Sequence, residues 1–418
     1  MTPHIDTQVC VVGGGPGGLM LGLELARRGC DVVVVEQSTK FTRHFRGESV
    51  SPDSVRLLDQ RGLLEEISAR LDFEETRRFE ISDGGRRVLE VDFRDLSPTG
   101  YLPIELPQQI LLDVLAEAAA RHPGFTLLRG SSATGLVEEG GRVVGVRCGG
   151  GQDGGTQIRA ALTVGADGRF SRVLRQSGLA HKKTPLNRDV LWCTLPFPDT
   201  WDRSTVRVRI DRDQHALCLP THPGLVRVGL NIPKGGLKEF RCLGINALRS
   251  RLSSLVPELA PAAAEHITGW NSMMLLDIFT TSVPQWSRPG LVLIGDAAHT
   301  LSPVLGQGVN HAVIDAVTLA PLVVRALRSS DRSGLLDAAT QRFQHLRSPH
   351  VEQARKVQLA QERAFSVSSA PAVRVRQGLY TLIDSNDWLK RRVWRRVYYT
   401  LPAGRRHDSP IPRHSTPL

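Results

Sequence analysis

A strand, a glycine-rich turn, a helix and a second strand near the N-terminus constrain the fold of this chain most strongly. Residues 9–36 read VCVVGGGPGGLMLGLELARRGCDVVVVE, and the second strand ends in Glu36. The glycines match G-x-G-x-x-G: Gly13 permits a tight turn, Gly15 lets the backbone approach a pyrophosphate, and Gly18 lets helix and strand pack closely. The helix N-terminus presents free N–H groups to that phosphate, and the carboxylate suits ribose hydroxyls. The segment therefore predicts a dinucleotide-binding βαβ unit, without separating NAD from FAD.

Composition limits the classes of protein to consider. The 418 residues are 41% hydrophobic, which is enough for a large core and for two or three domains. We find no uninterrupted apolar stretch long enough to span a bilayer, and the first strand leaves no room for a signal peptide. The six cysteines show no C-x-x-C pairing, which favours reduced thiols in a cytoplasmic protein; we expect no disulfide framework and no metal site.

The formal charge of +11 is concentrated near the C-terminus, where residues 371–418 hold ten Arg and Lys against three Asp, a net +7. The rest of the chain is only mildly basic, so we expect no nucleic-acid partner. Residues 388–396 are strongly basic with tryptophans interleaved. This pattern fits a solvated helix that closes the fold, which we favour, or a dock for an anionic partner or membrane surface. Residues 404–418 are expected to be disordered.

A second signal is a carboxylate at the end of a buried strand. Residues 161–175 read ALTVGADGRFSRVLR, in which an apolar strand ends at Asp167 and Gly168 and a basic helix follows Ser171. A carboxylate in this position either contacts a ligand or caps the helix, and both roles of Asp167 stay open.

A third signal lies in residues 290–315, which read GLVLIGDAAHTLSPVLGQGVNHAVID. A strand ends at Asp296, a loop follows, and a helix opens near Gly306. The carboxylate can accept hydrogen bonds from a ribitol chain, and the glycines let the backbone approach a flat ring. The helix dipole stabilises negative charge there, as on a reduced flavin. For His299 and His311, which flank the loop, we expect structural roles rather than proton transfer.

In this order the three signals resemble the FAD-dependent aromatic hydroxylases, the para-hydroxybenzoate hydroxylase-like flavoprotein monooxygenases, over roughly residues 7–350. The resemblance implies non-covalent FAD, with NAD(P)H and O2 as co-substrates, and hydroxylation of an electron-rich aromatic or polyketide-like small molecule through a C4a-hydroperoxyflavin. It implies that Pro303, Gly306 and Gly308 border the reacting ring. The FAD contacts it implies are Gly13, Gly15, Gly17, Gly18, Glu36, Arg46, Gln108, Asp167, Gly168, Gly295, Asp296, Gly306, Gln307, Gly308, Val309 and Asn310. The residues alone also allow Arg46 to be a solvated loop arginine.

The implied fold is α/β, a Rossmann-type FAD-binding domain with an inserted antiparallel-sheet substrate domain and C-terminal helices. Alternating apolar residues between 206 and 232 predict that sheet, which would roof the flavin. Trp192, Trp201 and His215 on or near it are the candidates to face the substrate. The expected divisions are 1–72, 100–180 and 281–350 for the FAD-binding domain, 73–99 and 181–280 for the substrate domain, 351–403 for a helical segment and 404–418 for the tail.

Other functions are compatible with this fold. A flavin-dependent halogenase would carry a W-x-W-x-I-P segment, which the chain lacks. A flavin-dependent reductase would turn over without oxygen, and a non-catalytic flavin-binding protein would bind FAD without oxidising NAD(P)H. The sequence specifies neither the substrate nor the oligomeric state. An aromatic secondary metabolite, tethered to an acidic carrier protein that meets the basic C-terminal segment, is the hypothesis we retain.

Overall fold

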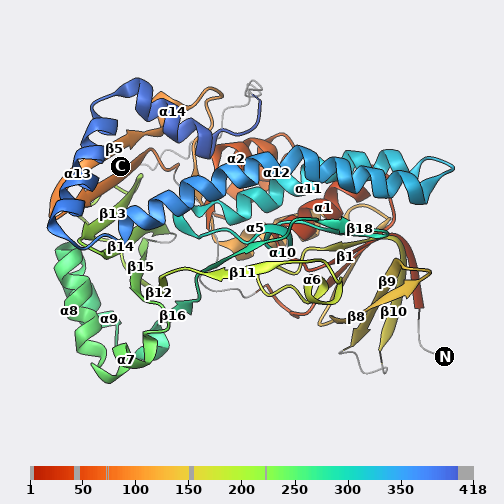
Figure 1. Ribbon diagram of the computed structural model, residues 1–418, viewed down its shortest axis with the longest axis horizontal. Coiled ribbons are helices and arrows are strands. Elements are labelled where there is room, and N and C mark those ends of the chain that lie inside the picture. Colours follow the sequence, from red (N-terminus) through yellow and green to blue (C-terminus); the bar gives the residue numbers. More distant parts are fainter. Residues whose placement is uncertain are drawn as a thin grey trace.

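The computed structural model describes residues 4–41, 48–71, 73, 75–149, 155–221 and 224–402. Two large sheets lie next to each other along the long axis of the molecule, and long helices cross above them (Figure 1). This architecture confirms the predicted α/β fold. The predicted FAD contact Arg46 and the expected disordered tail, 404–418, lie outside the described residues.

The first sheet is organised around the glycine-rich segment. Its eight strands are β1 (His4–Val12), β2 (Val32–Glu36), β7 (Phe125–Arg129), β8 (Ser132–Glu139), β9 (Arg142–Gly149), β10 (Thr156–Gly165), β18 (Ser287–Arg288) and β19 (Leu291–Leu293). The central strands run parallel in the order β19-β10-β1-β2-β7, and β2 is buried throughout, as expected for a strand covered on both faces. Because the strands are parallel, the carboxyl ends of β1, β2, β10 and β19 meet at one edge, where α/β proteins bind ligands.

Helices cover this sheet, and α1 packs against both α5 and α11. The elements of this part of the chain are α1 (Pro16–Ala26), β3 (Ser49–Val50), α2 (Pro52–Asp59), α3 (Leu63–Ser68), β6 (Ile104–Glu105), α5 (Gln108–Ala120), α6 (Arg172–Gln176), α10 (Asp296–His299), a 3₁₀ turn (Val304–Gly306), α11 (Gly308–Leu327) and α12 (Arg332–Phe365). Residues 304–327 are long and apolar enough, by composition, to cross a membrane, although Asp315 interrupts them. With 61% of the apolar window buried, this is a weak indication of a span, because core helices have the same character.

The second sheet has seven strands in the order β16-β12-β15-β14-β13-β4-β5. Their bounds are β4 (Arg78–Asp83), β5 (Arg86–Asp92), β12 (Arg188–Pro196), β13 (Thr205–Asp211), β14 (Gln214–Thr221), β15 (Leu225–Pro233) and β16 (Met274–Leu276). The predicted antiparallel pairing holds except between β13 and β4, which run parallel because the early hairpin β4–β5 adds to the edge of strands that come much later. The antiparallel sheet predicted from residues 206–232 is confirmed for β13, β14 and β15; the parallel pair involves β4, which that pattern does not cover.

Each face of the second sheet has its own apolar core. Helices cover one face of the sheet. The opposite face is turned to the first sheet and the C-terminal helices. The remaining elements of this part are α4 (Phe93–Leu96), β11 (Lys182–Pro185), α7 (Leu237–Cys242), α8 (Ile245–Leu255), a 3₁₀ turn (Pro257–Leu259), α9 (Ala260–His266), a second 3₁₀ turn (Trp270–Ser272) and β17 (Phe279–Ser282). Residues 270–281 form the second 3₁₀ turn, then β16, and then β17, which pairs with β11 in a separate ribbon.

The C-terminal helices close the second sheet. α12 runs along both sheets, and α13 (Ala370–Asp384) and α14 (Asp387–Tyr398) fold back over β5 (Figure 1). On α14 the side chains of Trp394, Val397 and Tyr398 are buried, whereas most of the basic side chains are exposed. The basic segment is thus a solvated helix with one face in the core. The boundary expected at residue 350 falls inside α12.

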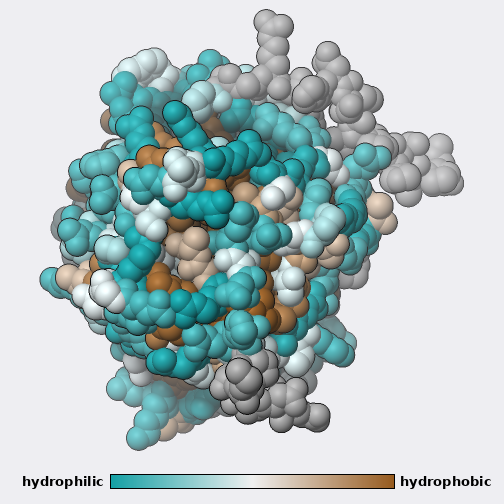
Figure 2. All heavy atoms as spheres, turned by 90° about the vertical axis from the view of Figure 1, so that its right-hand side faces the viewer, coloured by the Kyte–Doolittle hydropathy of each residue, from teal (hydrophilic) through white to brown (hydrophobic). Residues whose placement is uncertain are grey.

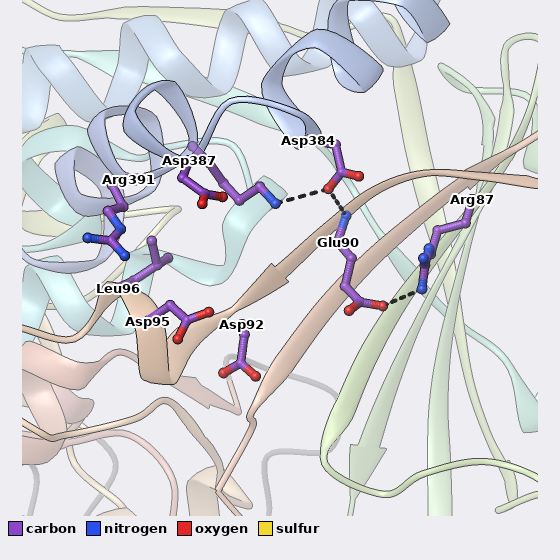
Figure 3. A pocket seen from close by; sticks show the side chains of 9 residues that line it. Arg87, Glu90, Asp92, Asp95, Leu96, Asp384, Asp387 and Arg391 are labelled. Carbon is purple, nitrogen blue, oxygen red and sulfur yellow. Dashed lines mark hydrogen bonds and ion pairs between the residues drawn. The ribbon is translucent and has the colours of Figure 1, made fainter.

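A small polar groove of about 230 Å³ marks the seam between the hairpin and these helices (Figure 3). Asp384 accepts a hydrogen bond from the backbone N–H of Glu90 at 2.9 Å and forms an ion pair with Lys390 at 3.1 Å. Arg87 pairs with Glu90 at 2.7 Å. The hydrogen bond between Glu90 and Asp384 joins β5 to α13, the Lys390–Asp384 pair joins α14 to α13, and the Arg87–Glu90 pair lies within β5.

The far end of the molecule, where α11 and α12 meet, is largely hydrophilic, with apolar residues gathered towards the middle of that face (Figure 2). Some apolar area is ordinary on a surface that faces water. All six cysteines are free thiols, and five of them are buried.

Candidate functional site

One cavity of about 960 Å³ runs from the carboxyl edge of the first sheet to the inner face of the second. Its wall is predominantly apolar, with a few convergent polar groups, as in small-molecule sites of this size. The predicted residues that line it are Gly13, Gly15, Gly17, Glu36, Gln108, Asp167, Gly168, Trp192, His215, Gly295, Asp296, Pro303, Gly306, Gln307, Gly308, Val309 and Asn310. Sequence segments nearly 300 residues apart thus meet around one volume.

Two glycines of the first loop are required by close backbone contacts. Gly13 has φ of +110°, and a Cβ added to it would lie 2.4 Å from the carbonyl oxygen of Ala166. Gly18 does not line the cavity, but a Cβ there would lie 1.9 Å from the carbonyl oxygen of Gly13. The first glycine therefore forms the turn and the second allows α1 to begin directly against it.

The start of α1 is open to a phosphate. Its N-terminus has no side-chain cap and no acidic residue in the first turn, so its N–H groups and dipole face the cavity. Glu36 accepts hydrogen bonds from the N–H groups of Gly14 and Ser38, both at 2.8 Å, which fixes its carboxylate at the end of β2. These residues fit the ADP half of FAD: backbone donors for the pyrophosphate beside a carboxylate for the ribose.

Of the two roles that the sequence left open for Asp167, the structure shows the capping of a helix. Its carboxylate accepts the Ser171 hydroxyl at 2.5 Å and the N–H groups of Arg172 and Val173 at 2.6 and 3.0 Å, so it caps α6. It also lines the cavity next to Gly168. The backbone N–H of Ala166 donates to the carbonyl oxygen of Val12 at 2.8 Å, which joins this strand end to the start of the first loop.

The loop before α11 is shaped by unusual backbone conformations. Gly306 has φ of +62°, and a Cβ there would lie 2.9 Å from the Cβ of Ser49. Leu305, a bulky residue, also has positive φ, at +69°, and such residues concentrate at functional sites. Asn310 ties the loop down by donating to the carbonyl oxygen of Gly306 at 2.9 Å and accepting from the N–H of Ser51 at 2.8 Å. These backbone conformations and hydrogen bonds give the cavity a preformed wall that suits a flat ring.

Two features of this wall suit a flavin. α11 begins at Gly308 without a side-chain cap or an acidic residue in its first turn, so its positive end faces the cavity. Gln108, at the start of α5, lines the cavity from the other side, whereas the neighbouring Gln109 is exposed. Pro303 lines the same wall.

A buried charge network supports the loop from behind. Asp315 binds His299 Nε2 and Arg347 Nε, both at 2.7 Å, and accepts the N–H of Gly295 at 2.8 Å. Burial alone would raise the pKa of Asp315, but the charges and hydrogen bonds of His299 and Arg347 outweigh it and lower that pKa. Burial and the nearby Arg347 charge lower the pKa of His311 to about 3. Neither histidine lines the cavity, which fits the structural roles expected for them.

The apolar end of the cavity, here called the chamber, lies under the second sheet. It is lined by Val190, Val206, Val208, Leu217 and Leu219, which project from one face of β12, β13 and β14. Strand alternation places Trp192 and His215 on this face. Trp192 lies against Gly229, and its indole nitrogen has no hydrogen-bond partner among the described residues.

Trp201 lies elsewhere. The structure places it on the opposite face of the sheet, in contact with Phe197 at a ring separation of 5.9 Å and beneath the Arg207 guanidinium at 4.7 Å. It is not among the residues that line the cavity. The reason is that it follows the end of β12, where the chain turns over the edge to the helix-covered side.

Sequence reasoning missed the charged pairs of the chamber. Arg188 donates from Nε to Glu362 at 2.6 Å, and the two residues are 174 positions apart. Arg227 pairs with Glu48 at 2.9 Å. The only local signal is that Arg188 stands in register with the apolar residues at 190 and 192 of its strand, so it must face the same way.

Glu105 is a further polar group that the sequence did not mark. It lies at the cavity wall and accepts the Ser49 hydroxyl on both oxygens, at 2.9 and 2.8 Å. Burial, reinforced by the charge of Glu48, raises the pKa of Glu105 to about 8. This carboxyl group therefore keeps its proton to a higher pH than an exposed glutamate does.

Comparison with known proteins agrees with this geometry. A family model described as "FAD binding domain" matches residues 6–356. The 6-methylpretetramide 4-monooxygenase of Streptomyces rimosus is 39% identical over 395 residues, which cover 94% of this chain and 92% of that protein. The protoasukamycin 4-monooxygenase of Streptomyces nodosus subsp. asukaensis is 28% identical, covering 88% and 91%. The solved structure of PqsL from P. aeruginosa, in complex with 2-aminobenzoylacetate, shares the fold with a TM-score of 0.77 and 24% identity, covering 90% of this chain and 99% of that one.

Proposed function

We propose a substrate class and a set of binding residues for this chain, which belongs to the FAD-dependent aromatic hydroxylases of the para-hydroxybenzoate hydroxylase type. The chain is an FAD-dependent monooxygenase. Its substrate, in our proposal, is an electron-rich aromatic of several fused rings, of the polyketide type. Two observations support this: the apolar chamber at the end of a 960 Å³ cavity, and the similarity to a monooxygenase named for 6-methylpretetramide.

The observation that carries the proposal is the continuity of the cavity. The same volume touches both uncapped helix N-termini, at Gly15 and Gly308, and the apolar face that holds Leu217 and Leu219. A cofactor bound along the first sheet would therefore end directly beneath the second. Bound FAD supplies the electron transfer from NAD(P)H and the activation of O2.

The residues of the chain do the remaining work. We assign the ADP half to the loop of Gly13 and Gly15 with Glu36, the ribitol to Asp296, and the ring to the wall of Pro303, Gly306 and Gly308. Gln108, Asp167, Gly168, Gln307, Val309 and Asn310 complete the binding site, with Gly17 and Gly18 supporting α1. The apolar chamber positions the substrate and excludes water, which protects a reactive oxygen species from loss.

Two finer statements are also part of the proposal. The first is that the protein works in the cytoplasm, in keeping with its six free thiols. The second is that an acidic carrier protein presents the substrate to the exposed arginines of α14. The test of this second point is charge reversal at Arg392 and Arg396, rather than deletion of α14, because Tyr398 of that helix lines the cavity. Loss on the tethered substrate alone would support carrier docking, and equal loss on the free substrate would contradict it.

The decisive experiment is purification followed by a visible spectrum and a substrate screen. We expect a yellow protein whose NADH or NADPH oxidation under air is accelerated by fused-ring phenols, with one oxygen atom from labelled O2 in the product. A requirement for halide would instead indicate a halogenase, turnover without oxygen a reductase, and flavin binding without stimulated oxidation a non-catalytic protein. A colourless protein that stays colourless with added FAD would end the proposal.

A further inference from the structure

His215 is the polar group that stands out in the chamber. It lies on the same face of β14 as Leu217 and Leu219, is 6% exposed, and packs its ring against Phe365 at a centroid separation of 4.9 Å. Its surroundings there are mainly apolar. A buried imidazole needs a hydrogen-bond partner for each ring nitrogen, and one left without a partner is costly.

The first ring nitrogen has a partner that fixes the tautomer. His215 Nδ1 lies 3.1 Å from Arg188 Nη1. A guanidinium can only donate, so Nδ1 is the acceptor and the ring proton sits on Nε2. Burial, followed by the charge of Arg188, holds the pKa of His215 well below its ordinary value, so the ring stays neutral.

Arg188 is itself held in place. Its Nε donates to the Glu362 carboxylate at 2.6 Å, and Nη2 donates to the backbone oxygen of the same residue at 2.7 Å. The other oxygen of that carboxylate accepts the hydroxyl of Ser302, which precedes Pro303 in the loop. The orientation of the imidazole is thus set by a chain of contacts that ends at the proposed flavin wall.

The second ring nitrogen is left for a ligand. In the part of the chain that the structure describes, His215 Nε2 makes no hydrogen bond. The neighbouring contact of the residue, its backbone N–H with Asn231 Oδ1 at 2.7 Å, involves the main chain only. His215 lines the cavity, and among the described residues its Nε2–H donor has no partner.

The charges on the described strands of the second sheet disfavour one class of ligand. Two cations of the second sheet line it, and each already has a carboxylate: Arg188 has Glu362 at 2.6 Å, and Arg227 has Glu48 at 2.9 Å. No unpaired cation projects into the chamber from the described strands of this sheet. A substrate carboxylate would enter an apolar volume without a counter-charge, which is strongly unfavourable.

We propose that the chamber takes an aromatic substrate without a carboxylate and that His215 Nε2–H donates a hydrogen bond to a phenolic or carbonyl oxygen of it. Arg188 and Glu362 act as positioning residues, through the imidazole. This inference rests on the proposed monooxygenase function. It adds that the imidazole supplies a neutral donor in an apolar wall, and that this donor sets which edge of the ring system faces the flavin.

The test is a binding comparison on the FAD-loaded protein, without NAD(P)H, read from the absorbance change of the flavin. The probes are 2-naphthol, naphthalene and 6-hydroxy-2-naphthoate, which share one ring system. For the wild type we expect 2-naphthol to bind about tenfold more tightly than naphthalene, because of one hydrogen bond. We expect 2-naphthol to bind at least about tenfold more tightly than 6-hydroxy-2-naphthoate as well. In His215→Phe, which keeps a flat ring against Phe365, the preference for 2-naphthol over naphthalene should vanish.

Two further variants separate recognition from a general change of shape. Leu217→Met alters the wall without touching a donor and should move the affinities of 2-naphthol and naphthalene by the same factor. His215→Gln keeps a donor and should restore part of the preference. An unchanged preference in His215→Phe, tightest binding of the carboxylate, or binding of none of the three probes overturns the inference. FAD content and NAD(P)H oxidation, measured separately, report whether the monooxygenase function itself fails.

Discussion

The two ends of the cavity are formed by different parts of the residues, backbone at one end and side chains at the other. The end at the first sheet is made of backbone: glycines, uncapped helix N-termini and strand ends that lie within short sequence motifs. The end at the second sheet is made of side chains, including ion pairs such as Arg188–Glu362 that join segments 174 residues apart. Backbone recognition demands one residue type at one position. Side-chain recognition demands only a suitable volume and partner, so we expect substitutions to act very differently at the two ends.

The largest effect is expected at the backbone end. A Cβ at Gly18 would overlap the carbonyl oxygen of Gly13, at 1.9 Å, so Gly18→Ala must displace α1 from the loop. We expect purified Gly18→Ala protein to contain no detectable flavin in its visible spectrum. Gly29→Ala is the control, because a Cβ at Gly29 would meet nothing within 4 Å, even though Gly29 has a positive φ of +78°. It should cost only about 1 kcal/mol of stability and retain FAD. A yellow Gly18→Ala protein would show that the loop is adaptable.

The next effect concerns the charged pair of the chamber. Arg188→Met leaves the buried Glu362 carboxylate without its cation and should lower the free energy of unfolding by about 3–5 kcal/mol. Adding Glu362→Gln removes the unpaired charge, so the double variant should be more stable than Arg188→Met alone. Urea unfolding monitored by circular dichroism measures both. If the effects of Arg188→Met and Glu362→Gln on the free energy of unfolding simply added, the two residues would not be coupled, contrary to what their 2.6 Å contact indicates.

A smaller effect, and one that depends on pH, is expected at Glu105. Folding raises its pKa from 4.5 to about 8, so the folded state binds more protons than the unfolded state between these values. This carboxyl group therefore contributes stability below pH 4.5 that is lost as the pH rises through 8. We expect the difference in unfolding free energy between wild type and Glu105→Gln to change by on the order of 3–4 kcal/mol across this window. Taking the difference cancels the titration of other groups, and a flat difference would contradict the raised pKa.

The contrast between the two ends also explains what could be predicted from the sequence. The first loop, Asp296 and Gly306 stand out because their roles depend on local spacing, and the structure brings them to one cavity. The parallel pairing of β13 with β4 was missed, because an alternation pattern fixes which face a residue occupies and says nothing about which edge a distant hairpin joins. The partners of Arg188 and Arg227 were missed for the same reason, since Glu362 and Glu48 lie in segments with no pattern that marks them.

His215 and the two tryptophans show how far alternation can be used. Residues 215, 217 and 219 share a face by strand periodicity, and the structure places all three in the chamber. Trp192 also lies on the face that the periodicity of its strand predicts. Trp201 lies beyond the end of β12, where periodicity no longer applies, and it falls on the helix-covered face. A prediction of facing therefore holds within a strand and fails just past its end.

The smallest expected effect tests that distinction. Trp201→Phe removes ring contacts with Phe197 and Arg207 on the far side of the sheet, at a cost of about 1 kcal/mol in stability, and should leave the affinity for 2-naphthol within about twofold of wild type. Trp192→Phe instead opens space beside Gly229 in the wall of the chamber and should change that affinity by about threefold or more. Both affinities come from the same flavin absorbance titration. Should Trp201→Phe prove the more damaging of the two for binding, the substrate would have to lie on the other face of the sheet, and the division between the two ends of the cavity would fail with it.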